Sequence, residues 1–270
     1  MQNPTVPVIL SIAGLDPSAG AGVLADLKTS AALGVYGMAC VTALTVQSTL
    51  GVERVEAVNG QIVRETLECL AKDVRLAAIK LGMLGNGAVA AVVADWLARQ
   101  PGVPVVLDPI LKSSSGKELL DAEGQRVLRE QLLARVDWIT PNLDELAVLT
   151  GLPAAKTAAE TEKSGKILLE IAASLGNPGL KIVVTGGHAA RPDDLLLARE
   201  ICHWFPGEWV ATSSTHGTGC AFSSALAARL ALGDDPLAAV AAAKHYVAGA
   251  LRHAYPVGRG AGSGNHFWMR

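Results

Sequence analysis

The sequence is poor in aromatic residues and in cysteine, and it has no long uncharged apolar run. Aromatic residues make up 4% of the 270 positions, whereas 50% are hydrophobic and 18% are charged. Such a chain is too apolar to be disordered, and its core must consist mainly of aliphatic side chains. No run of about 18 uncharged apolar residues occurs, so the sequence predicts no membrane-spanning helix and no membrane partner.

An excess of positive charge is also lacking. The 23 Lys and Arg residues are balanced by 25 Asp and Glu residues, which leaves a net charge of −2 and a pI of about 6.3. Binding to nucleic acid or anionic lipid depends on clustered basic side chains, so neither partner is expected. The first five residues contain no basic residue, and the apolar stretch after them is too short for a signal peptide. We therefore expect a cytoplasmic protein.

The four cysteines are widely spaced and form no Cys-x-x-Cys pair: they are Cys40, Cys69, Cys202 and Cys220. This spacing argues against a zinc site and against a disulfide scaffold. Three of them are expected in the core, where a free cysteine behaves as a small hydrophobic residue. Glycine and proline are spread along the chain without a linker, so we expect residues 1–270 to form one domain.

Continuous aliphatic runs alternate with segments of helical spacing. Runs of this length are typical of strands buried on both faces of a parallel sheet, and the alternation predicts an α/β fold. The runs are Val8–Ala13, Ala77–Leu81, Val103–Leu107, Asp137–Thr140 and Lys181–Thr185, and Met38–Val46 is also strand-like. The helical segments are Gly22–Leu33, Gln61–Asp73, Ala88–Arg99, Gly124–Ala134 and Thr161–Ala173, followed by two alanine-rich helices at Cys220–Leu232 and Leu237–His253.

Polar residues or glycines follow five of these predicted strands. The segments that follow begin at Gly14, Gly82, Asp108, Pro141 and Gly186. Open α/β sheets bind ligands at the carboxyl ends of their strands, so these residues predict one shared site. The alternative for each of them is an ordinary turn residue.

The segment Gly20–Ala25 matches the glycine pattern of dinucleotide-binding loops, but its context does not fit. In that pattern the glycines lie directly at the strand end, and an acidic residue follows about 20 residues later. Here Leu15–Ala19 separate the glycines from the strand, and Val41–Gln47 occupy the place of the acidic residue. The better interpretation is a glycine-rich loop that lets a small substrate approach the backbone, with Asp26 one turn later to hydrogen-bond it.

The segment Thr215–Cys220 places two glycines just before a predicted helix. Unpaired backbone N–H groups at a helix start, together with the helix dipole, form an anion site. Cys220 in this position is expected to have a lowered thiol pKa. A cysteine hydrolase with His216 as the base, and a simple helix start with a buried thiol, are the alternatives.

A third pattern is Thr140–Glu145. Asn142 and Glu145 have the spacing of a helix capping box, which needs no further function. The same two residues lie on one helical face, and together with Asp108 they could hold the water shell of Mg²⁺.

Taken in order, these motifs resemble those of the hydroxymethylpyrimidine/phosphomethylpyrimidine kinases, a family of the ribokinase-like superfamily. The resemblance rests on Ala13–Gly22, Ala25–Thr29, Thr42–Gln47, Lys80–Leu84, Leu107–Pro109, Thr140–Asn142, Gly186–His188 and His216–Cys220, and it extends to Asn265–Phe267. It implies a three-layer α/β/α sandwich with a mostly parallel central sheet and a small lid. It also implies two ATP-dependent phosphorylations in thiamine biosynthesis, first of 4-amino-5-hydroxymethyl-2-methylpyrimidine and then of its monophosphate.

The resemblance implies roles for individual residues as well. Gln47 would recognise the pyrimidine edge through its amide, which offers a donor and an acceptor together. The remaining substrate-binding residues would be Met83, Gly14, Gly20, Gly22 and Asp26. The catalytic anion hole would consist of Gly217, Thr218, Gly219 and Cys220, with Cys220 in the position of the aspartate base of related sugar kinases. ATP would be bound by Lys244, Asn142, Thr185 and Gly187, and Mg²⁺ by Asp108 and Glu145.

The sequence departs from the family pattern at Thr185, because many relatives carry lysine there and the threonine removes one contact to the nucleotide phosphates. Two other functions compete with the first. One is a pyridoxal kinase of the same architecture, against which Gln47 favours the aminopyrimidine. The other is a catalytically silent pyrimidine-binding regulatory protein, against which the complete Gly217–Cys220 motif argues. The resemblance further implies a homodimer, with Gly34–Val46 near the interface.

Overall fold

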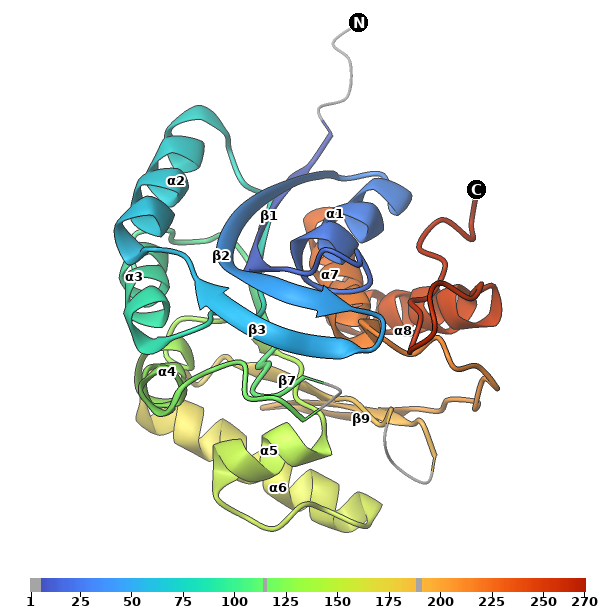
Figure 1. Ribbon diagram of the computed structural model, residues 1–270. Coiled ribbons are helices and arrows are strands. Elements are labelled where there is room, and N and C mark those ends of the chain that lie inside the picture. Colours follow the sequence, from blue (N-terminus) through green and yellow to red (C-terminus); the bar gives the residue numbers. More distant parts are fainter. Residues whose placement is uncertain (1–5, 114–115, 188–190) are drawn as a thin grey trace, which may run out of the picture.

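A nine-stranded sheet runs through the middle of the described part of the protein (Figure 1). The computed structural model describes residues 6–113, 116–187 and 191–270. Residues 1–5, on which the signal-peptide expectation rests, and His188 of the Gly-Gly-His motif lie outside the described residues. The strand order is β3-β2-β1-β4-β5-β6-β7-β8-β9.

Six neighbouring strands are parallel, and the three strands nearest the edges are antiparallel. The parallel strands are β1 (Val8–Leu15), β2 (Tyr36–Ser48), β4 (Ala78–Leu81), β5 (Val105–Leu107), β6 (Trp138–Ile139) and β7 (Lys181–Val184). The antiparallel strands are β3 (Gly51–Ala57), β8 (Asp194–Ala198) and β9 (Ile201–Phe205). Strands β2 and β3 form a hairpin at one edge of the sheet. We refer to this hairpin as the lid, after the small lid that the family resemblance implies.

Helices cover both faces of the sheet, which confirms the predicted three-layer α/β/α arrangement (Figure 1). One face packs against α2 (Gly60–Asp73), α3 (Gly87–Leu97), α4 (Ala122–Val127), α5 (Leu143–Thr150) and α6 (Ala158–Ser174), with a π-helical turn at Leu128–Leu132. The other face packs against α1 (Gly22–Ala32), α7 (Thr218–Ala231) and α8 (Pro236–Arg252). No helix of the described residues is both long enough and apolar enough to span a bilayer.

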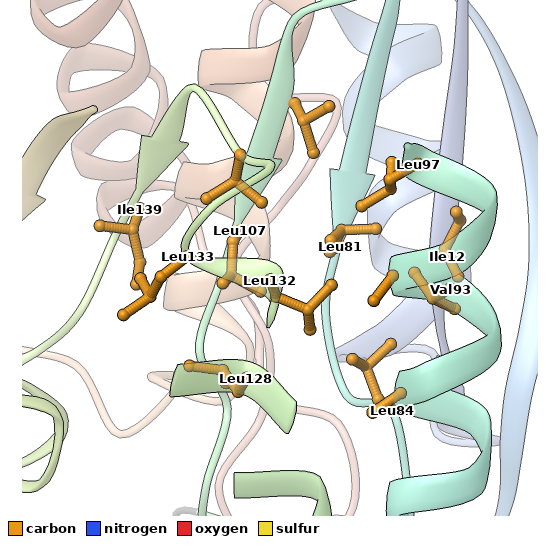
Figure 2. Close-up of a cluster of buried hydrophobic side chains, with 14 of the residues drawn as sticks. Ile12, Leu81, Leu84, Val93, Leu97, Leu107, Leu128, Leu132, Leu133 and Ile139 are labelled. Carbon is orange, nitrogen blue, oxygen red and sulfur yellow. The ribbon is translucent and has the colours of Figure 1, made fainter. Parts of the chain in front are cut away.

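The core is aliphatic on both sides of the sheet. Figure 2 shows Leu81, Leu107 and Ile139 from three neighbouring strands pointing toward Leu132 and Leu133. Successive residues of a strand point to opposite faces, and both faces are covered here, so most positions of a central strand are apolar. This geometry explains why the predicted runs are continuous rather than alternating.

The three antiparallel strands are absent from the sequence-based prediction. Strand β3 reads Gly-Val-Glu-Arg-Val-Glu-Ala and is largely solvent-exposed, so it gives no continuous aliphatic signal. Strand β8 contains a short apolar run, but periodicity alone does not separate such a run from a buried helical segment. The last strand, β9, lies at the sheet edge and has only one buried residue. Two of the three strands that the sequence did not predict, β3 and β9, are therefore the edge strands of the sheet.

Candidate active site

The carboxyl ends of the parallel strands bring the predicted site residues to one edge of the sheet. The backbone N–H of Gly82 donates to the Ile12 carbonyl at 2.9 Å, and the N–H of Asp108 donates to the Leu81 carbonyl at 2.9 Å. Farther along the sheet, Thr185 pairs with Asn142 in an isolated parallel bridge. The residues that follow β1, β4, β5, β6 and β7 are thus neighbours in space.

Two glycine-containing turns pack directly against each other at this edge. Gly217 adopts φ +78°, and a Cβ atom there would lie 1.9 Å from the Gly20 carbonyl oxygen. Gly22 adopts φ +59°, and its Cβ would lie 2.2 Å from the Gly14 carbonyl oxygen. Only glycine combines this backbone conformation with so close an approach. The structure thereby joins the glycine-rich loop to the predicted anion hole.

Met83, which the family resemblance places with Gly14 among the substrate-binding residues, lies beside Gly14. A Cβ atom on Gly14 would be 3.0 Å from the Met83 sulfur. Met83 is 6% exposed, and its backbone carbonyl accepts a hydrogen bond from the Thr42 hydroxyl at 2.5 Å. This contact ties β2 of the lid to the segment after β4.

Cys220 lies in the first turn of α7, which begins at Thr218 after Gly217 in a left-handed conformation. Its thiol contacts the backbone N–H of Gly22 and the carboxylate of Asp108. The expected lowering of the thiol pKa is wrong. Burial raises the pKa of Cys220 to about 12, although Lys80 and the Gly22 N–H act in the opposite direction. The thiol is therefore neutral near pH 7, where too little thiolate is present for Cys220 to act as a base or a nucleophile.

Asp26 is buried, and its carboxylate is paired within the protein. Its carboxylate forms an ion pair with Lys80, at 3.0 and 2.9 Å from Nζ. It also accepts hydrogen bonds from the hydroxyls of Ser11 at 2.5 Å and Ser224 at 2.7 Å. With 2% of Asp26 exposed, its oxygens are occupied by the protein. This corrects the expected direct hydrogen bond from Asp26 to a substrate.

Sequence reasoning missed Lys80 as part of the site. Lys80 is 0% exposed. Burial opposes its charge, but Asp26 outweighs this effect and raises the pKa of the ammonium group above its usual range. A lysine inside the aliphatic run Ala77–Leu81 is the signal that could have revealed it, because a buried lysine almost always has a charged partner.

Asp108 and Glu145 interact electrostatically at the same edge of the sheet. Burial raises the pKa of Asp108, although Lys80 acts against this rise. Burial and the neighbouring Asp108 carboxylate raise the pKa of Glu145. Two carboxyl groups that disfavour each other's negative charge would be stabilised by a cation between them.

The predicted capping box of α5 is present. The Glu145 N–H donates to the Asn142 side chain at 2.8 Å, and the Asn142 N–H donates to the Glu145 carboxylate at 2.9 Å. Asn142 therefore caps α5 whatever else it does. Among the described residues, no group of three or more His, Cys, Asp or Glu side chains is arranged to hold a metal ion. The pair Asp108 and Glu145 still fits Mg²⁺, which takes one or two carboxylates and keeps several waters.

Lys244 lies next to the loop that follows β7. Its ammonium group is 2.7 Å from the Asp194 carboxylate and 2.6 Å from the Pro192 carbonyl. Asp194 also accepts a hydrogen bond from the Gly186 N–H at 2.9 Å. The side chain of Lys244 is 17% exposed, so it is not a solvated lysine on a helix surface. Asp194 thus links Lys244 to Gly186, which lies between Thr185 and the exposed Gly187.

A second group that sequence reasoning missed surrounds Gln47 at the end of β2. The Nε2 atom of His216 lies 2.7 Å from the Asp16 carboxylate and 3.1 Å from the Gln47 amide. Asp16 also accepts hydrogen bonds from the backbone N–H groups of Ser18 and Ala21 at 2.8 and 2.9 Å. The lid, the glycine-rich loop and the anion hole therefore meet at His216.

Comparisons with known proteins show the family to which this chain belongs. A family model described as phosphomethylpyrimidine kinase matches residues 16–265. The chain belongs to this family. A hydroxymethylpyrimidine/phosphomethylpyrimidine kinase of Staphylococcus aureus strain Mu50 is 36% identical over 263 residues, covering 96% of this chain and 93% of the relative. The predicted family and the kinase class are thereby confirmed.

Two solved structures show that this kinase family shares its fold with another. The phosphomethylpyrimidine kinase of Clostridium difficile 630 superposes with a TM-score of 0.77 and 30% identity, covering 90% of this chain and 98% of that one. The ADP complex of the pyridoxal kinase of Bacillus subtilis superposes with a TM-score of 0.87 and 29% identity, covering 98% of this chain and 99% of that one. The ribokinase-like fold that the sequence predicts is confirmed.

We expect Lys80→Met to destabilise this kinase strongly. The substitution leaves the Asp26 carboxylate buried without its cation, which lowers the free energy of unfolding by about 3–5 kcal/mol. Chemical denaturation at pH 7 measures the change. The double variant Lys80→Met/Asp26→Leu should regain most of the loss, and Lys72→Met on the exposed face of α2 is the matched control. A loss below about 1 kcal/mol in Lys80→Met would contradict the ion pair.

The raised pKa of Cys220 predicts the pH dependence of its alkylation. With a pKa of about 12, the thiolate fraction is small at pH 7 and rises about tenfold per pH unit up to pH 9. The rate of reaction with iodoacetamide, followed by mass spectrometry, should rise in the same way without a plateau. The measurement uses a Cys69→Ser/Cys202→Ser background, because those two thiols are exposed and the expectation that they lie in the core is wrong. A plateau below pH 9 would show that the pKa is lowered after all.

Proposed function

We propose that this kinase transfers the terminal phosphoryl group of ATP to the hydroxymethyl group of 4-amino-5-hydroxymethyl-2-methylpyrimidine, and then a second one to the resulting monophosphate. The product would be the pyrimidine diphosphate used in thiamine biosynthesis. The observation that carries this proposal is the position of Gln47, whose amide meets the Gly217–Cys220 turn through His216. An amide can pair with the amino group and ring nitrogen of an aminopyrimidine while the alcohol points at the turn.

The acceptor pocket would be lined by Gln47, Met83 and the glycines of the first loop. The close approach of Gly14, Gly20 and Gly22 to neighbouring residues leaves no room for larger side chains there. A planar ring would therefore lie against backbone, with the Met83 thioether beside it. Asp26 would support this wall from below through Lys80, Ser11 and Ser224.

Phosphoryl transfer would take place at the start of α7. The backbone N–H groups of Gly217, Thr218, Gly219 and Cys220 begin a 14-residue helix, and unpaired N–H groups of this kind bind anions. Phosphoryl transfer relies on positioning and charge neutralisation and has little need of a strong base. A neutral Cys220 thiol suits this role, because it orders the turn through Gly22 and Asp108 and adds no negative charge next to the phosphates.

ATP would bind along the loops that follow β6 and β7. Lys244, held by Asp194, would supply a positive charge to the phosphates, and Asn142, Thr185 and Gly187 would lie beside the nucleotide. With Thr185 in place of the lysine of many relatives, Lys244 would carry more of this charge neutralisation. Mg²⁺ would be held by Asp108 and Glu145, and it would neutralise phosphate charge there.

Pyridoxal phosphorylation is the second candidate. The observation that favours it is the likeness to the Bacillus subtilis pyridoxal kinase, at a TM-score of 0.87. The 36% identity to a hydroxymethylpyrimidine/phosphomethylpyrimidine kinase over 96% of this chain favours the pyrimidine. A catalytically silent binding protein is the least supported function, because the complete turn at Gly217–Cys220 and the Asp108–Glu145 pair are features of transfer chemistry.

Steady-state kinetics with ATP should separate these functions. We expect kcat/KM for the pyrimidine alcohol to exceed that for pyridoxal by about tenfold or more, because a polar pocket discriminates strongly against an analogue that leaves its groups unpaired. The pyrimidine monophosphate should also be phosphorylated. Turnover confined to pyridoxal would overturn the proposal, and binding of the pyrimidine without any turnover would favour the silent protein. The control is Cys220→Ala, which should bind the pyrimidine but lose kcat.

We also propose a homodimer that forms through the lid, and a cytoplasmic location. Leu44, Val46 and Leu50 are 51%, 46% and 64% exposed on the β2–β3 hairpin. Exposed apolar side chains gathered on one element are typical of an interaction surface.

Light scattering should give a mass of twice the 27.9 kDa of the chain. The variant Leu44→Glu/Val46→Glu should shift the mass to that of the monomer, because two charges would be buried in the interface. The matched control is Ile62→Glu on α2, where the isoleucine is 57% exposed and the oligomer should be unaffected. A monomeric wild-type protein at micromolar concentration is the result that would rule out the dimer.

A further inference from the structure

The contact between Asp16, His216 and Gln47 joins three segments that are far apart in the sequence. Asp16 follows β1, Gln47 lies near the end of β2, and His216 directly precedes Gly217 of the anion hole. The side chains of Asp16 and His216 are 4% and 15% exposed. The Asp16 carboxylate accepts hydrogen bonds from Ser18 and Ala21 in addition to its 2.7 Å contact with His216.

These partners determine which nitrogen of His216 carries a hydrogen. Burial acts to raise the pKa of Asp16, but the hydrogen bonds from His216 and Ser18 outweigh it and lower the pKa. An ionised carboxylate only accepts hydrogen bonds. The Nε2 atom of His216, 2.7 Å away, must therefore donate to it.

The donor at His216 in turn decides the orientation of the Gln47 amide. The amide nitrogen lies 3.1 Å from His216 Nε2, and two N–H groups do not hydrogen-bond to each other. A 180° rotation of the amide exchanges its nitrogen and oxygen, which have nearly the same shape. The Gln47 oxygen and the Asp16 carboxylate then both accept a bifurcated hydrogen bond from the Nε2–H group of His216.

Thr45 requires the same orientation. Its hydroxyl lies 3.0 Å from the Leu15 carbonyl and 3.1 Å from the amide atom of Gln47 that is farther from His216. The hydroxyl donates its one hydrogen to the Leu15 carbonyl, so its oxygen can only accept a hydrogen bond from the Gln47 amide. The rotated amide supplies that donor, and all four groups are then satisfied.

We propose that the Asp16–His216 pair is a specificity-determining pair, which holds the Gln47 carbonyl toward the anion hole and thereby selects an aminopyrimidine alcohol over pyridoxal. This inference rests on the proposed function, because it assumes that Gln47 contacts the substrate ring. The two residues act through Gln47 and position it.

The chemistry of the two substrates explains the selection. Next to its hydroxymethyl group the pyrimidine carries an amino group, which donates, and then a ring nitrogen, which accepts. Pyridoxal carries an aldehyde, which accepts, and then a hydroxyl group, which donates. The hydroxymethyl group must point toward Gly217–Cys220, so the adjacent substituent meets the amide atom on the His216 side. An oxygen there pairs with the amino group but repels the aldehyde oxygen.

The test is the selectivity of Asp16→Asn. An asparagine can place its NH₂ group against His216, which lets Nε2 accept and the Gln47 amide rotate back. We expect the ratio of kcat/KM for the pyrimidine alcohol to that for pyridoxal to fall about tenfold or more. The fall should come mainly from a raised KM for the pyrimidine, with kcat changed less than about threefold. Titration calorimetry without nucleotide should show the same loss in binding.

Asp16 also holds the glycine-rich loop, so a second variant is needed. His216→Ala removes the donor and leaves Gln47 free to rotate, and the selectivity should fall in the same direction. The matched control is His203→Ala on strand β9, where the side chain is exposed and the selectivity should remain that of the wild type. Melting temperatures identify any variant that fails to fold.

The wild-type protein supplies a readout that requires no variant. Long-range ¹H–¹⁵N correlation spectra report which ring nitrogen of His216 carries the hydrogen, and we expect it on Nε2. A neutral ring with its hydrogen on Nδ1, or an unchanged selectivity ratio in a folded variant, would overturn the inference. If the wild-type protein neither binds nor phosphorylates the pyrimidine, the proposed function itself has failed.

Discussion

The buried ion pair between Asp26 and Lys80 connects the elements on which the site is built. Asp26 belongs to α1 and Lys80 to β4, and the hydroxyls of Ser11 from β1 and Ser224 from α7 complete its hydrogen bonds. Two charges removed from water are tolerated only when each has its partners in good geometry. The start of α7, the glycine-rich loop and the sheet edge must therefore keep their relative positions. The anion hole proposed at Gly217–Cys220, which would consist of backbone N–H groups, would need this rigidity.

The same ion pair means that this kinase, with a net charge of −2, must neutralise several phosphate charges without Lys80. Lys80 is committed to Asp26 and is fully buried, so it is not available to the phosphates. Under the proposed function, charge neutralisation would come from the helix start at Gly217–Cys220, from Lys244 and from a divalent ion at Asp108 and Glu145. These groups are local, and none of them requires a basic surface, which agrees with the composition.

The parallel part of the fold and the place of the site could be predicted because burial on both faces leaves a continuous apolar run in the sequence. The strand-end residues follow from the same rule, since parallel strands end at one edge. The pKa of Cys220 was predicted in the wrong direction, because position in a helix is visible in a sequence whereas the depth of burial is not. Asp26 was misplaced for a related reason: its partner Lys80 is 54 positions away.

A shared fold does not decide between a pyrimidine and pyridoxal. The backbone of this chain superposes at TM-scores of 0.87 and 0.77 on kinases named for the two substrates. The pyrimidine presents a donor and then an acceptor, whereas pyridoxal presents an acceptor and then a donor at the corresponding ring positions. A single rotation of the Gln47 amide distinguishes the two substrates without moving the backbone. Selectivity therefore resides in the residues that fix the amide. Asp16 and His216 meet this requirement because both are part of the rigid edge, which the Asp26–Lys80 pair holds in place.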